Sequence, residues 1–133
     1  MPYELIDHIA DMGIRVSAPS MEGLFQEAAY ALADILGGRG GDGLQEVMVE
    51  SQGIDRVDLL VRWLQEILYL IEVKGFRLRA ATIQGLTETL ALGVLQGAYT
   101  TEPLTTEIKA VTYHNLDITY IDKVFAVTII LDR

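Results

Sequence analysis

The stretch that most constrains the fold is residues 55–74, which is apolar on more than one side of a predicted helix. Apolar residues recur there every three or four positions, and further apolar residues widen the stripe. Asp55 is a suitable N-cap and Gly75 a stop signal. A helix of this kind has to be covered by other elements on several sides, so we interpret Trp63 as a core or interface anchor rather than a ligand platform.

A second helix is predicted over residues 21–36. Ser20 supplies the N-cap, apolar residues follow at helical spacing, and Gly37 and Gly38 end the helix. Most of the remaining chain has strand character, with β-branched residues concentrated in 124–131, which we expect to be a central strand. The other predicted strands are 13–17, 44–50, 76–80 and a return strand after a turn at 86–89. Residues 108–113 and 116–120 are also strand-like and could form one bent strand or two.

This order of elements, β-α-β-α followed by a run of strands, predicts an α+β fold. Two helices would pack on a mostly antiparallel or mixed β-sheet. In the strand at 76–80, Phe76, Leu78 and Ala80 alternate with Arg77 and Arg79, so we expect both arginines to be exposed. With 133 residues, half of them hydrophobic, the chain has enough material for one core, and we expect a single domain over residues 1–133.

The charge balance argues against a nucleic-acid-binding surface. Asp and Glu number 19 against 10 Lys and Arg, which gives a net charge of −9. Only three of the cations are lysines, and affinity for a phosphate backbone comes from clustered Lys and Arg. We therefore expect no tight, direct binding of nucleic acid and favour a basic protein partner or a cation.

Several site classes are excluded by composition. The chain has no cysteine, which removes disulfides, thiolate metal sites and thiol nucleophiles, and its two histidines argue against a multi-histidine zinc site. The N-terminal residues are acidic and do not resemble a signal peptide, and no apolar run approaches the length of a membrane span. We expect a cytoplasmic protein with no membrane contact.

The glycine-rich loop at 37–43 formally contains G-x-G-x-x-G. A dinucleotide site needs that motif after a strand and before a helix, whereas here it follows a predicted helix and precedes a predicted strand. We interpret the loop as a mobile connector.

Two aspartates are candidates for a cation site. Asp11 precedes the first predicted strand, and Asp132 ends the long apolar C-terminal strand, followed only by Arg133. Each could instead cap a turn or mark the exit of a strand into solvent. If the two meet in space, their carboxylates and the neighbouring carbonyl oxygen suit Ca²⁺ or Mg²⁺ better than zinc.

Three further residues are functional candidates. Lys109 alternates with apolar neighbours in a predicted strand, where it could guard a sheet edge or act as a point cation for phosphate or a partner carboxylate. His114 could belong to the same patch, and His8 lies three residues before Asp11. A lone histidine is more often packed or hydrogen-bonded than a ligand.

Four blocks of the chain, in the right order, resemble the archease family. Residues 3–14 resemble its signature H-T-A-D-x-G, 59–70 its second helix, 107–114 its T-E-V-K-A-I-T-Y-H block, and 127–132 its terminal V-x-I-I-L-D-I. Ile9 replaces the usual threonine and Arg133 a terminal apolar residue, while the middle, 77–106, matches weakly.

The resemblance implies an accessory protein rather than an enzyme. Archeases assist the RNA ligase that joins 3′-phosphate or 2′,3′-cyclic phosphate ends to 5′-hydroxyl ends in tRNA splicing, promoting ligase guanylylation and turnover. The family's calcium ligands map onto Asp11, Asp132 and the carbonyl of Arg133, and a family lysine maps onto Lys109. Two alternatives stay open: a small metal-dependent hydrolase using the same carboxylates, and a chaperone-like modulator of tRNA-modifying enzymes.

Overall fold

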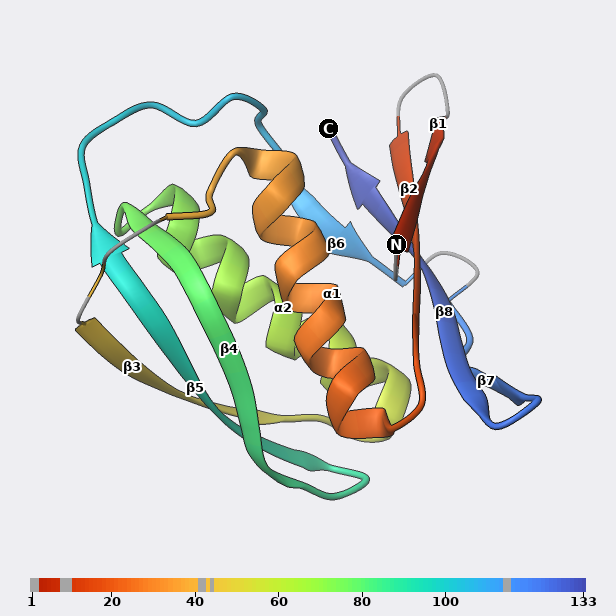
Figure 1. Ribbon diagram of the computed structural model, residues 1–133. Coiled ribbons are helices and arrows are strands. Elements are labelled where there is room, and N and C mark those ends of the chain that lie inside the picture. The colour runs from red at the N-terminus through yellow and green to blue at the C-terminus, as the bar shows by residue number, and fades with distance from the viewer. Residues whose placement is uncertain (1–2, 8–10, 41–42, 44, 114–115) are drawn as a thin grey trace.

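The computed structural model describes residues 3–7, 11–40, 43, 45–113 and 116–133. Figure 1 shows two helices side by side, with strands on both sides of them. The elements in chain order are β1 (Tyr3–Asp7), β2 (Asp11–Ala18), α1 (Met21–Leu36), β3 (Gln45–Gln52), α2 (Arg56–Glu72), β4 (Phe76–Leu86), β5 (Leu90–Tyr99), β6 (Ala110–Thr112), β7 (Thr119–Ile121) and β8 (Val124–Asp132).

The strands form two separate antiparallel sheets. One has the order β1-β2-β8-β6, with β7 also paired to β8, and the other has the order β3-β5-β4. Each helix contacts both sheets, α1 through β2 and β4 and α2 through β3 and β6. The predicted α+β class is confirmed, but the helices are covered by two sheets rather than one, which explains why α2 is apolar on more than one side.

Both helices begin where the sequence predicts. The Ser20 hydroxyl accepts a hydrogen bond from the Gly23 N–H at 3.0 Å, and the Asp55 carboxylate accepts one from the Asp58 N–H at 2.8 Å. Gly37 has a φ of +72°, the left-handed conformation that ends α1 without steric cost. The end of α2 comes at Glu72, slightly before the predicted boundary.

The core between the helices and the three-stranded sheet is centred on Trp63. Its ring is fully buried, and its Nε1–H donates to the Phe25 carbonyl at 3.0 Å, which links α2 to α1. A Cβ on Gly93 would lie 2.3 Å from the ring, so the ring packs directly on the β5 backbone. Gly93 therefore lets the ring and the β5 backbone approach closely, and Gly85 lies at a register shift in the β4–β5 ladder.

One prediction for β4 is wrong. Arg77 is only 8 % exposed, although the alternating pattern placed it on the solvent side with Arg79. Its guanidinium donates to the carbonyls of Ile71 at 3.3 Å, Phe76 at 3.0 Å and Glu102 at 2.6 Å. The Ile71 carbonyl lies in the last turn of α2, where helix geometry leaves acceptors without intrahelical donors, and the same cation also satisfies the carbonyls of Phe76 and Glu102.

The glycine-rich loop after α1 is fastened to β4 in its described part. The Gly40 N–H donates to the Leu78 carbonyl at 2.9 Å, and the Leu78 N–H donates to the Gly38 carbonyl at 2.7 Å. The loop joins a helix to a strand, the reverse of the order that a dinucleotide site requires.

Two of the strands predicted near the C-terminus are shorter than expected. The segments predicted at 108–113 and 116–120 become two separate short strands, β6 and β7. A turn with Asp122 and Lys123 at positive φ leads into β8, which pairs with β2 on one side and with β6 and β7 on the other. Strand β1 was not predicted.

Within the described residues, no helix has the length and apolar character to cross a membrane.

Candidate functional site

The two candidate aspartates are brought together by the register of β2 and β8. Asp11 and Asp132 are direct partners in this antiparallel pair, and Asp132 also pairs with Ala110 of β6. In Figure 1 the start of β2 and the C-terminal end of β8 lie at the same end of the sheet. Two residues that are 121 positions apart in the chain therefore share one point of the sheet.

The backbone of Lys109 lies next to Asp132. Its N–H donates to the Asp132 carbonyl at 2.7 Å, immediately before β6 begins, and its side chain is exposed. Because β6 is the last strand on its side of the sheet, the position suits an edge-guarding lysine as well as a cation directed at a partner. Three chain segments thus converge here: the start of β2, the start of β6 and the end of β8.

We call this convergence of Asp11, Lys109, Asp132 and Arg133 the acidic tip. Asp132 is half-buried, and Arg133, which follows the last paired residue, is exposed. Asp11 is placed by its backbone pairing, and the predicted candidates His8 and His114 lie outside the described residues. A spacing of about 5 Å between the two carboxylates, which ligand distances of about 2.3–2.6 Å allow, stays a prediction.

The ligand atoms available at the acidic tip are oxygens, which suit a hard cation. Nowhere in the described part of the chain do three His, Cys, Asp or Glu side chains gather in a metal-binding group. A cation here would therefore depend on two carboxylates and backbone oxygen. Oxygen ligands of that kind suit Ca²⁺ or Mg²⁺, whereas zinc prefers nitrogen and sulfur.

A second polar cluster, which the sequence did not reveal, lies at the start of α2. Asp58 is 7 % exposed and accepts hydrogen bonds from the Ile54 N–H at 2.9 Å, the Arg62 Nε at 3.0 Å and the Tyr113 hydroxyl at 2.5 Å. The Tyr113 hydrogen bond is the main cause that lowers the pKa of Asp58, and the same bond raises the pKa of Tyr113. Asp58 and Tyr113 are 55 positions apart, so no local pattern could have paired them.

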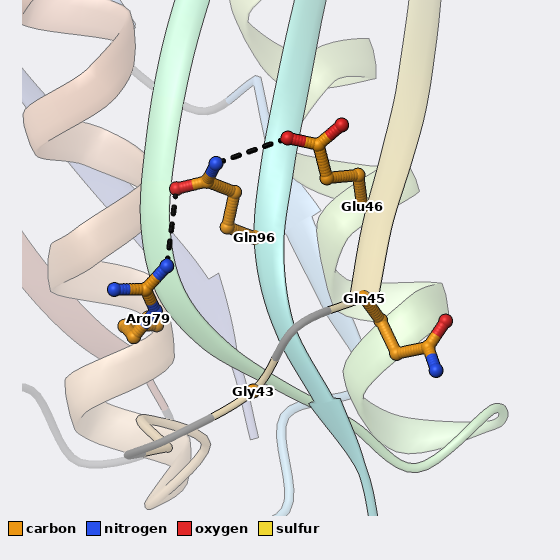
Figure 2. A pocket seen from close by; sticks show the side chains of 5 residues that line it. All are labelled: Gly43, Gln45, Glu46, Arg79 and Gln96. Carbon is orange, nitrogen blue, oxygen red and sulfur yellow. Dashed lines mark hydrogen bonds between the residues drawn. The ribbon is translucent and has the colours of Figure 1, made fainter.

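A hollow of about 380 Å³ on the three-stranded sheet is a weaker candidate. Figure 2 shows Gln96 between Arg79 and Glu46: Arg79 donates to the Gln96 amide oxygen at 3.4 Å, and Gln96 donates to Glu46 at 3.0 Å. The Gln45 side chain points away from this chain of hydrogen bonds. The polar groups satisfy one another across three strands, which favours a surface feature over a ligand site.

Comparison with known proteins decides the family. The model of the Archease protein family (MTH1598/TM1083) matches residues 3–132. The chain belongs to the archease family. Protein archease from Methanopyrus kandleri is 38% identical over 125 residues, which cover 89% of each chain. The resemblance of the four sequence blocks to archeases is thereby confirmed.

Two solved structures resemble the archease chain over nearly its whole length. The solution structure of protein 1598 from Methanobacterium thermoautotrophicum superimposes with a TM-score of 0.74, at 27% identity and 99% coverage of both chains. The crystal structure of an archease from Thermotoga maritima, described as a possible chaperone, has a TM-score of 0.70. It is 23% identical and covers 96% of this chain and 94% of that one, so it shows the fold alone.

Proposed function

We propose that this member of the archease family is a non-enzymatic accessory protein of an RNA ligase. The ligase would join 3′-phosphate or 2′,3′-cyclic phosphate ends to 5′-hydroxyl ends, and the accessory protein would promote its guanylylation and its turnover. The observation that carries the proposal is the register that pairs Asp11 with Asp132 beside the Lys109 backbone. The family's implied functional positions thus meet at one end of one sheet.

In this proposal, Asp11, Asp132 and the carbonyl of Arg133 hold Ca²⁺ or another hard divalent cation such as Mg²⁺. A bound cation would supply a concentrated positive charge with coordination positions for oxygen atoms of the partner. With so few anionic ligands, we expect an affinity on the order of 10⁻⁴ M for the protein alone, as in low-affinity calcium sites.

Lys109 has a separate part in the proposal. Its side chain is exposed, and its ammonium group is a compact point charge that suits a phosphate or a partner carboxylate. The net charge of −9 supports contact with a basic protein surface rather than with RNA itself.

Two other functions use the same surface. A metal-dependent hydrolase would use the same carboxylates and would need a nucleophile or general base beside them. A chaperone-like modulator of tRNA-modifying enzymes is the other alternative, and the Thermotoga maritima archease is itself described as a possible chaperone. It would act on a different partner, which makes the two proposals separable.

The test compares Asp11→Asn and Asp132→Asn with Asp122→Asn. Each change removes one negative charge with little change of shape, and Asp122 lies in the turn before β8, at the opposite end of that strand from Asp132. Ligase guanylylation is measured with each variant, together with thermal unfolding and calcium binding by calorimetry. We expect the first two variants to lose stimulation and calcium binding while melting normally, because neutralising one of two close carboxylates relieves repulsion.

Asp122→Asn should behave as the unmodified protein in all three measurements. If Asp11→Asn and Asp132→Asn melt normally and still stimulate the ligase fully, the carboxylate pair is structural and the mechanism is wrong. Capture of a tRNA-modifying enzyme in place of the ligase would favour the chaperone-like function, and RNA cleavage by the protein alone would favour the hydrolase.

A further inference from the structure

Three polar side chains along α2 bind the segment 108–113 one after another. The Glu72 carboxylate accepts a hydrogen bond from the Ile108 N–H at 3.2 Å, and the Gln65 amide donates to the Val111 carbonyl at 3.3 Å. At the start of the helix, Asp58 accepts the hydrogen bond from the Tyr113 hydroxyl. We call Asp58, Gln65 and Glu72 the polar ladder.

The spacing of the polar ladder matches an extended segment that runs antiparallel to the helix. Its members are seven residues apart, which is about 10.5 Å at 1.5 Å per helical residue. Ile108 and Val111 are three residues apart, which is about 10 Å in an extended chain. Tyr113 is only two residues further on, and the length of its side chain spans the remaining distance to Asp58.

The polar ladder lies along the free edge of β6, where a further strand of the sheet would pair. Strand β6 pairs with β8 on one side and is the last strand of its sheet. On its other side, Gln65 of α2 donates to the Val111 carbonyl. Glu72 of α2 accepts from the N–H of Ile108, which lies two residues before β6. Ile108 is fully buried, so its N–H has no access to water in place of Glu72.

Lys109 lies between the points that are held. Its preceding residue is bound to Glu72 of α2, and its own N–H is bound to the Asp132 carbonyl of β8. The backbone of this lysine is therefore fixed from the helix side and from the sheet side within two consecutive residues. The side chain of Lys109 is exposed, and it extends from a backbone that is held beside Asp132.

We propose that Asp58, Gln65 and Glu72 are positioning residues that set where Lys109 presents its ammonium group relative to Asp132. The proposal rests on the proposed function, because that function gives Lys109 its role toward the ligase. A ladder that only stabilised the fold would affect ligase stimulation no more than any equal loss of stability elsewhere. The two possibilities therefore differ in a measurable way.

The experiment uses the full chain and four variants. Glu72→Ala removes the acceptor for the Ile108 N–H, and Glu72→Gln keeps an acceptor oxygen without the charge. Glu66→Ala is the matched control, since Glu66 is an exposed glutamate of the same helix. Ile67→Val removes one methylene from the buried face of α2 and gives a variant whose lowered stability does not involve the ladder.

The first readout is amide hydrogen exchange by NMR. In Glu72→Ala we expect exchange at Ile108 and Lys109 to rise on the order of tenfold relative to Glu66→Ala and Ile67→Val. The second readout is stimulation of ligase guanylylation. We expect it to fall on the order of tenfold in Glu72→Ala and to be restored in Glu72→Gln, with both controls unchanged, because small misplacements of a functional group cost rate steeply.

Two results would overturn the positioning role. One is unchanged exchange at Ile108 and Lys109 in Glu72→Ala, and the other is full stimulation by this variant despite faster exchange. If the unmodified protein itself fails to stimulate the ligase, the proposed function is refuted. The exchange data then decide by themselves whether the polar ladder holds Lys109.

Discussion

Replacing Arg77 by methionine should destabilise the fold much more than the same change at Arg79. Methionine keeps an unbranched apolar stem and removes every guanidinium donor. Arg77 is 8 % exposed and donates to three carbonyls around the end of α2. Arg79 lies two residues further along β4, is exposed, and makes one long hydrogen bond of 3.4 Å to Gln96.

The magnitude follows from which carbonyls can return to water. Glu102 is exposed, so its carbonyl can be hydrated when the arginine is lost, whereas Ile71 and Phe76 are 1% and 0% exposed. An unsatisfied buried acceptor costs about 1–3 kcal/mol, so we expect Arg77→Met to lose about 2–4 kcal/mol. At about 3–4 °C per kcal/mol for a chain of this size, the melting temperature should fall by about 6–16 °C.

The assay is thermal unfolding followed by circular dichroism for Arg77→Met, Arg79→Met and the unmodified protein. Arg79→Met should change the free energy of unfolding by no more than about 0.5 kcal/mol, as expected for an exposed position. Both variants lose one positive charge, so a difference between them reports the buried contacts and not the net charge. If Arg77→Met melts within about 2 °C of Arg79→Met, the carbonyl contacts do not carry the stability assigned to them.

Two further predictions concern acid stability and RNA. The pKa of Asp58 is lowered, chiefly by Tyr113, so its contribution to stability is complete above its ordinary value of 3.8 and is lost as the pH falls through the lower folded-state value. The free energy of unfolding, measured with urea across this acid range, should depend less on pH in Asp58→Asn than in the unmodified protein. If the two proteins give parallel curves, the lowered pKa of Asp58 does not contribute to acid stability. Isolated tRNA should bind weakly and without specificity at physiological salt, given the net charge of −9. Tight binding in a filter or anisotropy assay would favour a direct RNA-handling role.

The features that the sequence predicted well are those fixed by neighbouring residues. The N-caps at Ser20 and Asp55 and the left-handed Gly37 act within one turn of a helix, so their signals are complete in a short window. The central position of β8 follows from its run of β-branched residues, because a strand paired on both sides is buried along most of its length.

The features that sequence reasoning missed depend on distant parts of the chain. Arg77 fits an alternating strand pattern, and its burial follows only from the carbonyls that the end of α2 places around it. The short acidic segment that forms β1 carries a weak signal by itself and becomes a strand through its pairing with β2. The division into two sheets likewise depends on both helices being covered from two sides.

The candidate site lies between these cases. The sequence suggested that Asp11 and Asp132 meet, and the strand register makes them direct backbone partners. Their role as metal ligands stays a prediction. The seven-residue spacing of Asp58, Gln65 and Glu72 was visible on the helix, but its meaning required the position of the segment 108–113.

The packing of Trp63 gives the molecule a built-in optical reporter. It is the single tryptophan of the chain, and its indole contacts α1 through the Phe25 carbonyl and β5 through the space left by Gly93. Its emission should therefore change when the helices separate from the three-stranded sheet, while a ligand at the end of the other sheet should leave it nearly constant. Fluorescence from this one ring can thus distinguish loss of the core from events at the surface without any added label.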